Sequence, residues 1–282
     1  MTLPYTIRPL DRTEVELHIG WAAAEGWNPG RHDSECFFAA DANGFLAGFL
    51  GDTPIATISV VRYGRTFGFL GLYIVRNEFR GQGYGLQIWN AGLAYLAGRT
   101  IGLDGVVAQQ DNYRKSGFML AYRNIRYQGT GGAHGPLDAR IVPLSSLPIA
   151  TTIAYDRSFF PEERAAFVRC WIRQPEGTAL GLMDRGGLAG YGVIRASRAG
   201  FKIGPLFADS PEIAESLFGA LQACVPPEAA VYLDTPEANP AAVALAQRHG
   251  MRVAFETARM YKGGTPKLPL PRLFGVTTFE LG

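Results

Sequence analysis

Arg80-Gly81-Gln82-Gly83-Tyr84-Gly85 is the most informative segment of this chain of 282 residues. It follows the apolar run 69–75, which is typical of a strand, and precedes the stretch 86–97, in which apolar residues recur at helical spacing. Glycine permits positive φ angles and a close approach of the backbone, so several N–H groups can point at one anion where the helix begins. Arg80 adds a positive charge beside this loop. The segment therefore predicts a phosphate site between a strand and a helix.

Two common phosphate motifs do not match these letters. The dinucleotide fingerprint requires Gly-x-Gly-x-x-Gly, but its last place is Leu86 when the motif starts at Gly81 and Ile88 when it starts at Gly83. The P-loop requires Gly-Lys followed by Ser or Thr, a sequence that this chain lacks.

The loop instead resembles the signature Arg/Gln-x-x-Gly-x-Gly/Ala of the GCN5-related N-acetyltransferase (GNAT) family, with Arg80, Gly83 and Gly85 at the fixed places. A second hallmark of this family, an Asn followed by Tyr-x-x-x-Gly-Phe, resembles segment 112–118. The resemblance implies an α/β (α+β) GNAT fold, with a mixed and mostly antiparallel sheet flanked by helices. It also implies acetyl-CoA (coenzyme A) as cofactor, without a metal, and transfer of the acetyl group to an amine.

The resemblance further implies which residues hold the cofactor. The main chain of residues 72–75 is expected to face the pantetheine arm, with N–H groups near Ile74 and Val75 stabilising the oxyanion. The glycine loop is expected to hold the diphosphate. The predicted cofactor-binding residues are Leu72, Tyr73, Ile74, Val75, Arg80, Gly81, Gln82, Gly83, Tyr84, Gly85 and Asn112.

Acetyl transfer needs a free amine, and neutralising a lysine-like group at pH 7 costs about 4–5 kcal/mol. In the family a tyrosine after the second motif strand often protonates the leaving thiolate, a role that the resemblance gives to Tyr113. The alternative is a phenol that only packs at the helix start, and the direct succession of Asn112 and Tyr113 departs from the usual spacing. Glu78 is the candidate base, against the alternatives of a solvated loop charge or ordered water. No Gly-x-Ser-x-Gly elbow is present, so direct transfer is favoured over a covalent enzyme intermediate.

The resemblance implies that the first helices and the loop around residues 24–30 grip the acceptor. Glu25 beside Trp21 and Trp27 could hold a cationic amine through charge and an aromatic face, with Asp33 as a weaker companion. The alternative is that the tryptophans only pack in the core.

The order of elements repeats in the second half of the chain. A strand over 201–207, a helix start at Ser210 and Pro211, a strand over 229–233 and a helix start at Asn239 follow the plan of the first half. We therefore predict two tandem domains: an acetyl-CoA-binding domain over 1–130, a linker over 131–150 and a degenerate domain over 151–282. At the place of the glycine loop the second half has Ala208-Asp209-Ser210-Pro211-Glu212, whose acidic residues and proline argue against a second diphosphate site.

Composition excludes several classes of function. A net charge of +2 with scattered basic residues argues against nucleic acid as a partner. Cys36, Cys170 and Cys224 are far apart in the sequence, so we expect neither a disulfide framework nor a zinc site. Cysteines without such partners favour a reducing compartment. The four histidines form no paired-ligand spacing. No basic leader segment and no apolar run of about 18 residues occur, so we expect a cytoplasmic protein with no membrane partner.

Three functions remain open at this point. The first is an N-acetyltransferase for a small primary amine, acting as a monomer or homodimer. The second is a non-catalytic sensor of acyl-CoA, and the third is an acyltransferase for a protein or peptide amine. An aminoacyl-transferring relative would need a basic surface for tRNA, which the net charge does not supply.

Overall fold

The computed structural model describes residues 3–132 and 138–282. Its strands form one continuous mixed sheet in the order β1-β2-β3-β4-β5-β12-β6-β11-β10-β9-β8-β7, and β13 pairs with β10. In the first half the elements are β1 Tyr5–Pro9, α1 Glu16–Ala24, α2 Asp33–Ala40, β2 Phe45–Leu50, β3 Thr53–Tyr63, β4 Phe67–Val75, α3 Tyr84–Tyr95, β5 Thr100–Val106, α4 Gln110–Lys115 and β6 Met119–Thr130.

The second half repeats this plan, as the sequence predicts. Ser210 Oγ caps α7 by accepting a hydrogen bond from the N–H of Ile213, and Asn239 Oδ1 caps α8. Both helices have proline in the first turn, where a missing N–H costs little. The elements are β7 Ile141–Pro143, α5 Ile149–Asp156, α6 Ala165–Trp171, β8 Gly177–Asp184, β9 Gly187–Ala196, β10 Phe201–Ala208, α7 Pro211–Gln222, β11 Ala230–Pro236, α8 Pro240–Arg248, β12 Arg252–Lys262 and β13 Leu273–Gly275.

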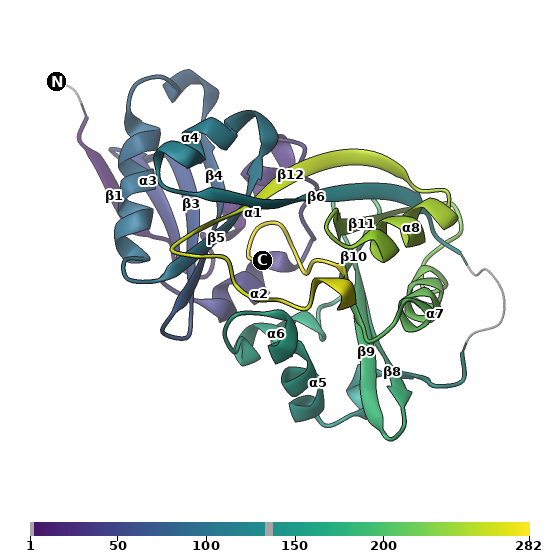
Figure 1. Cartoon of the computed structure of the whole chain (residues 1–282). Helices are drawn as coiled ribbons and strands as arrows, with labels where there is room; N and C mark the ends of the chain where they lie inside the picture. Colours follow the sequence, from purple (N-terminus) through teal and green to yellow (C-terminus); the bar gives the residue numbers. More distant parts are fainter. Residues whose placement is uncertain (1–2, 133–137) are drawn as a thin grey trace.

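The two halves exchange their sixth strands. β12, from the second half, lies between β5 and β6, so that Thr257 stands opposite Val106 on one side and Asn124 on the other. β6 in turn pairs with β11. In Figure 1 these two long strands run side by side from one half to the other. The predicted boundary at residue 130 thus divides the sequence without dividing the sheet.

The predicted linker over 131–150 also contributes to the sheet. Residues 141–143 form β7, which pairs with β8. Residues 133–137 of the predicted linker lie outside the described residues.

Helices cover both faces of the first-half sheet. On β3, Val60 packs in the cluster beneath α3, whereas its neighbour Val61 belongs to the cluster that α1 and α2 share with the second half. Leu86 fits the helical spacing of apolar residues in the stretch 86–97 and is therefore expected on the buried face of α3, but its side chain is 63% exposed. The face that packs on the sheet is formed instead by Ile88, Trp89, Gly92 and Leu96.

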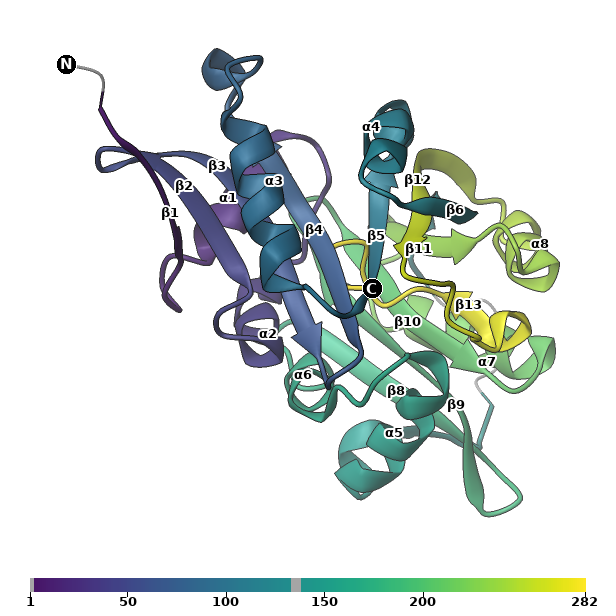
Figure 2. The ribbon, with the colours of Figure 1, turned by 60° about the vertical axis from the view of Figure 1, so that its left-hand side comes forward.

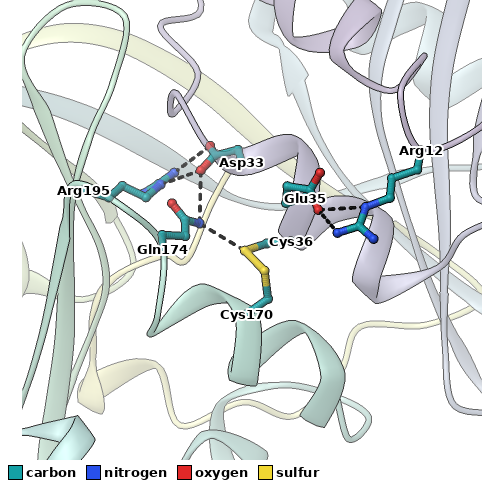
Figure 3. The surroundings of a disulfide bond; sticks show 7 residues. All are labelled: Arg12, Asp33, Glu35, Cys36, Cys170, Gln174 and Arg195. Carbon is teal, nitrogen blue, oxygen red and sulfur yellow. Dashed lines mark hydrogen bonds and ion pairs between the residues drawn. A yellow bond between two sulfur atoms is a disulfide. The ribbon is translucent and has the colours of Figure 1, made fainter.

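A disulfide joins the halves, which corrects the prediction of unpaired cysteines. Cys36 on α2 bonds to Cys170 on α6, with their Cα atoms 5.2 Å apart, and Cys224 is free. Figure 3 shows the bond between the two helices. Because the two cysteines are 134 positions apart in the sequence, only the packing of α2 on α6 reveals the pair. The bond removes the argument for a reducing compartment.

Among the described residues, no helix is long and apolar enough to cross a membrane.

Candidate active site

A cleft opens where β4 and β5 separate. The two parallel strands pair from Phe67 and Thr100 as far as Leu70 and Leu103, and no further. Beyond Gly71, β4 bulges away from β3, because Leu72 and Tyr73 together stand opposite Ile58. Leu72 has a φ of 47°, a left-handed conformation that is uncommon outside glycine and marks the bulge. The main chain after this point is turned toward the cleft rather than paired with β5.

The second half has the same cleft, but the chain itself fills it. β10 and β11 pair in parallel from Phe201 to Ile203, and then β13 enters beside β10. The N–H of Val276 donates to the main-chain oxygen of Asp234 on β11 (2.8 Å). Asn239 Nδ2 donates to the main-chain oxygen of Leu273 (3.0 Å). The chain's own segment around β13 therefore lies between β10 and β11, whereas the corresponding space between β4 and β5 is open.

The glycine loop borders the open cleft. Gly81 and Gly83 have φ values of 74° and 84°, and a Cβ at either would meet no atom within 4 Å. This free space at the start of α3 fits the oxygens of a diphosphate, which the N–H groups of a helix start attract. Arg80 lies beside it, with Nε donating to the main-chain oxygen of Val75 (2.8 Å) and Nη2 paired with Glu25 (2.7 Å).

A cavity of about 820 Å³ joins the cleft and the loop. Its size fits a small-molecule or cofactor site. Gln82 and Tyr84, which the sequence also predicts as cofactor-binding, are not in its wall, and Gln82 Nε2 donates to the main-chain oxygen of Glu78. The predicted residues that line the cavity are Glu25, Leu72, Tyr73, Ile74, Val75, Trp27, Arg80, Gly81, Gly83, Gly85, Asn112 and Tyr113.

Tyr113 lies in the wall of the cavity, on α4. Its ring stacks on Trp89, with centroids 5.6 Å apart, and passes so close to Gly105 that a Cβ there would stand 2.1 Å from the ring. Burial raises the pKa of Tyr113 to about 12, and the neighbouring Tyr73 adds to this. The phenol is therefore protonated at neutral pH, as a proton donor must be. Its neighbour Asn112 accepts a hydrogen bond from Lys115 Nζ (3.3 Å).

Two further predicted residues, Glu78 and Asp33, do not lie in the cavity wall either. Glu78 is exposed and pairs with Arg76, so its surroundings fit the alternative of a solvated loop charge. Asp33 is fully buried, accepts hydrogen bonds from Arg195 (2.8 and 3.2 Å) and is part of the contact between the halves drawn in Figure 3. Trp21 packs against the core, whereas Trp27 contributes to the cavity.

The far end of the cavity is built from residues that sequence reasoning missed. Arg126 reaches it from β6 and is held by Asp234 (2.6 and 2.7 Å) and by the main-chain oxygen of Trp27 (2.8 Å). Three further segments contribute, and no motif spacing links them. The other newly found wall residues include Asp104, Phe255, Thr257, Phe279 and Glu280.

Asp104 is engaged in structural contacts. Its carboxylate pairs with Arg259 (2.6 and 2.8 Å) and accepts a hydrogen bond from Asn124 (2.8 Å). In the described part of the chain, no group of three or more His, Cys, Asp or Glu residues could hold a metal ion.

The comparisons agree with this architecture. The Acetyltransferase (GNAT) family matches residues 11–118, and an Acetyltransferase (GNAT) domain matches residues 152–275. The chain belongs to the GNAT acetyltransferase family, with two GNAT domains in tandem, and is an acyltransferase.

Individual relatives extend over nearly the whole chain. The chain is 30% identical over 278 residues to a holothin acyltransferase from Pseudoalteromonas sp. (strain SANK 73390), covering 99% of this chain and 95% of the relative. A putative acetyltransferase from Pyrococcus horikoshii has a TM-score of 0.83 at 21% identity, covering 99% and 96% of the two chains. A tandem GNAT protein from the clavulanic acid biosynthesis pathway has a TM-score of 0.63 at 13% identity, covering 94% and 100%. The two solved structures share the fold.

Proposed function

We propose that this protein is an acyl-CoA-dependent N-acetyltransferase that moves an acetyl group directly to a small primary amine. The observation that carries the proposal is the single cavity that the glycine loop, the bulged strand β4 and Tyr113 share. Arg80 and the N–H groups at the start of α3 would hold the diphosphate, and the main chain of residues 72–75 would face the pantetheine arm. When bound, acetyl-CoA supplies the acetyl group as a thioester.

The protein's own residues would position the reactants and move protons. The N–H groups after the bulge are suited to stabilise negative charge on the acyl oxygen. Tyr113 is suited to give a proton to the sulfur, since burial keeps its phenol protonated. Holding both partners in one cavity lowers the entropic part of the barrier.

The first half is the proposed catalytic half. In the second half β13 takes the place of a pantetheine arm, and Asp209 lies where the loop would need positive charge. Asp209 is paired with Arg272 and accepts a hydrogen bond from Tyr155 (2.7 Å). A second cofactor would have to displace this chain segment.

Calorimetric titration with acetyl-CoA tests the proposal. We expect about one equivalent to bind to the wild type and binding to be lost in an Arg80→Ala, Gly83→Asp double variant, whose new carboxylate would fill the space that Gly83 leaves open. A Ser210→Ala, Glu212→Gln variant, changed at the corresponding loop of the second half, serves as the control and should bind normally. Failure of the wild type to bind acetyl-CoA would overturn the proposal.

The alternative of a non-catalytic sensor predicts binding without turnover. Thiol release from acetyl-CoA with any amine distinguishes the two. The third candidate, a protein or peptide acceptor, is less consistent with a cavity whose wall includes the buried residues Phe279 and Glu280.

A further inference from the structure

The last segment of the chain enters the cavity of the first half. After β13 in the second-half cleft, residues 276–282 continue toward β3 and β4, and Figure 2 shows this end between the two halves. The main-chain oxygen of Glu280 packs against Gly71 and accepts a hydrogen bond from Ser59 Oγ (3.5 Å). Gly71 is the residue at which β4 begins to bulge. Glu280 is therefore anchored beside the point where the proposed thioester site begins.

The carboxylate of Glu280 forms no direct ion pair, although Arg126 and Lys202 lie near enough to interact with it electrostatically. It is 4% exposed, and its Oε2 accepts a hydrogen bond from Thr278 Oγ1. Among the described residues, no Lys, Arg or His nitrogen lies within 4.0 Å of it. Arg126 is held by Asp234 instead. Because Arg126 and Lys202 act on this buried carboxylate without pairing with it directly, a cationic ligand that forms a direct ion pair at this point would be favoured.

The wall that contains Glu280 also contains aromatic rings, and the Arg126 guanidinium lies over two of them, 4.8 Å from the centroid of Phe279 and 5.9 Å from that of Phe255. Trp27, Phe255 and Phe279 line the cavity together with Glu280. Such rings bind flat apolar bodies and also attract cations through their faces.

The same wall has few cationic groups that could bind the carboxylate of a ligand. The cationic residues in the described wall are Arg80, Lys115 and Arg126. Arg80 is paired with Glu25, Arg126 with Asp234, and Lys115 donates to Asn112 near the glycine loop. None of these three wall cations is thus left unpaired at the end of the cavity where Glu280 lies, and the buried Lys202, which interacts with Glu280 electrostatically, is not in the wall.

We propose that this end of the cavity is the acceptor site, where Glu280 binds the amino group of a small aromatic primary amine that carries no carboxylate, and takes up its proton. This inference rests on the proposed function. The ring of the acceptor lies among Trp27, Phe255 and Phe279, and its nitrogen points to the bulge of β4.

The proton balance defines the role of Glu280. The acceptor enters as an ammonium ion, and one proton passes to the Glu280 carboxylate. The nitrogen then forms the C–N bond to the acyl carbon while the C–S bond breaks. The nitrogen loses a second proton to solvent in this step, and the sulfur gains one from Tyr113. Glu280 and Tyr113 return to their starting states by exchange with solvent, so the net products are the amide, the free thiol and one proton.

A matched pair of probes tests the site without relying on turnover. Protein saturated with coenzyme A is titrated calorimetrically with 2-phenylethylamine and with phenylalanine, which differ by one carboxylate. We expect 2-phenylethylamine to bind at least about tenfold more tightly than phenylalanine, and Glu280→Gln to weaken 2-phenylethylamine by at least about tenfold, the effect of one charge-assisted hydrogen bond.

Glu256→Gln is the control variant. Glu256 lies on β12, pairs with Arg123 outside the cavity wall, and should leave binding of both probes unchanged. Because Glu280→Gln keeps the size of the side chain, its affinity for coenzyme A should equal that of the wild type. The same two variants are then compared for thiol release from acetyl-CoA with 2-phenylethylamine, where only Glu280→Gln should lower kcat/KM.

The outcomes separate this inference from the proposed function. If the wild type binds coenzyme A but neither amine, or binds phenylalanine as well as 2-phenylethylamine, the acceptor class is wrong and the cofactor site stands. If Glu280→Gln binds 2-phenylethylamine as the wild type does, the role of Glu280 is wrong. If the wild type does not bind coenzyme A, the proposed function itself fails.

Discussion

The main-chain oxygen of Glu280 lies so close to Gly71 that a Cβ atom at position 71 would stand 2.2 Å from it. Contacts of this length do not occur between real atoms, and the oxygen belongs to the main chain, so a side chain at position 71 must displace the tail. The bulge of β4 and the last segment of the chain are therefore fitted to each other. At Gly71 the first half contacts the last segment of the second half, at the proposed acceptor end of the cavity.

Gly71→Ala is expected to lower both stability and transfer. Overpacking of this kind costs about 1–3 kcal/mol in the free energy of unfolding, and the displaced tail carries Glu280 away from the bulge. Urea denaturation measures the first effect, and thiol release with 2-phenylethylamine the second. Gly20→Ala makes the same chemical change on α1, where a Cβ meets no atom within 4 Å, and should leave transfer unchanged. Equal stability of Gly71→Ala and the wild type would contradict the packing argument.

Glu25→Gln is expected to strengthen the binding of acetyl-CoA. Glu25 pairs with Arg80 and so competes with the diphosphate for that guanidinium group. Because both side chains are partly exposed, the pair is worth about 0.2–1 kcal/mol, which corresponds to an affinity gain of a few fold. Calorimetry measures the gain, with Glu16→Gln, whose carboxylate pairs with Arg198, as control. If Glu25 instead holds the acceptor, as the sequence predicts, KM for the amine rises and the affinity for acetyl-CoA does not change.

Tyr113→Phe is expected to lower kcat by about 100-fold or more while the affinity for acetyl-CoA stays the same. The ring can keep its stacking on Trp89, so the substitution removes only the hydroxyl group. Tyr95→Phe, which removes a hydroxyl bonded to Asp41 at the other end of α3, is the control. A kcat for Tyr113→Phe that matches this control would assign the phenol to packing.

Local signals in the sequence predicted the local structure well. Gly81 and Gly83 adopt the positive φ angles that the loop requires, and Ser210 and Asn239 cap their helices, because each depends on residues within one turn. The place of Glu78 in the loop gave no information about the direction of its side chain, which pairs with Arg76 outside the cavity wall, and its role as the base stays a prediction.

The features that the sequence did not predict depend on pairing between distant segments of the chain. The exchange of β6 and β12 depends on which strand edges meet, and the pattern of either strand alone fits several neighbours. Glu280 reaches the cavity only because β13 is held between β10 and β11, and these long-range contacts leave no local pattern in the sequence.

The disulfide is expected to contribute substantially to stability. Since 134 positions separate Cys36 from Cys170, the bond closes a long loop in the unfolded chain, and removing it costs about 2–5 kcal/mol. A Cys36→Ala, Cys170→Ala variant should therefore unfold at lower urea concentration. Cys224→Ala, at the free cysteine, should match the wild type. A reducing agent that shifts the wild type but not the double variant would assign the effect to the bond, and equal midpoints of the wild type and the double variant would contradict the prediction.

Lys202 is expected to make stability depend on pH. Its Nζ atom is buried and has no hydrogen-bond partner among the described residues. Burial, with a smaller effect of Arg126, lowers its pKa from 10.5 to about 8. Between these two values the unfolded chain binds more protons than the folded chain, so the free energy of unfolding rises with pH across this window, by about 3 kcal/mol in total.

Lys202→Met removes this cost. At pH 7 the variant should be more stable than the wild type by about 1–3 kcal/mol, and the difference should vanish as the pH approaches 10.5. Urea denaturation at a series of pH values measures both curves, and Lys267→Met, at an exposed lysine, is the control. Since other groups titrate equally in both proteins, the difference between the curves isolates Lys202. A constant difference between pH 7 and 10.5 would show that Lys202 keeps its ordinary pKa in the folded protein.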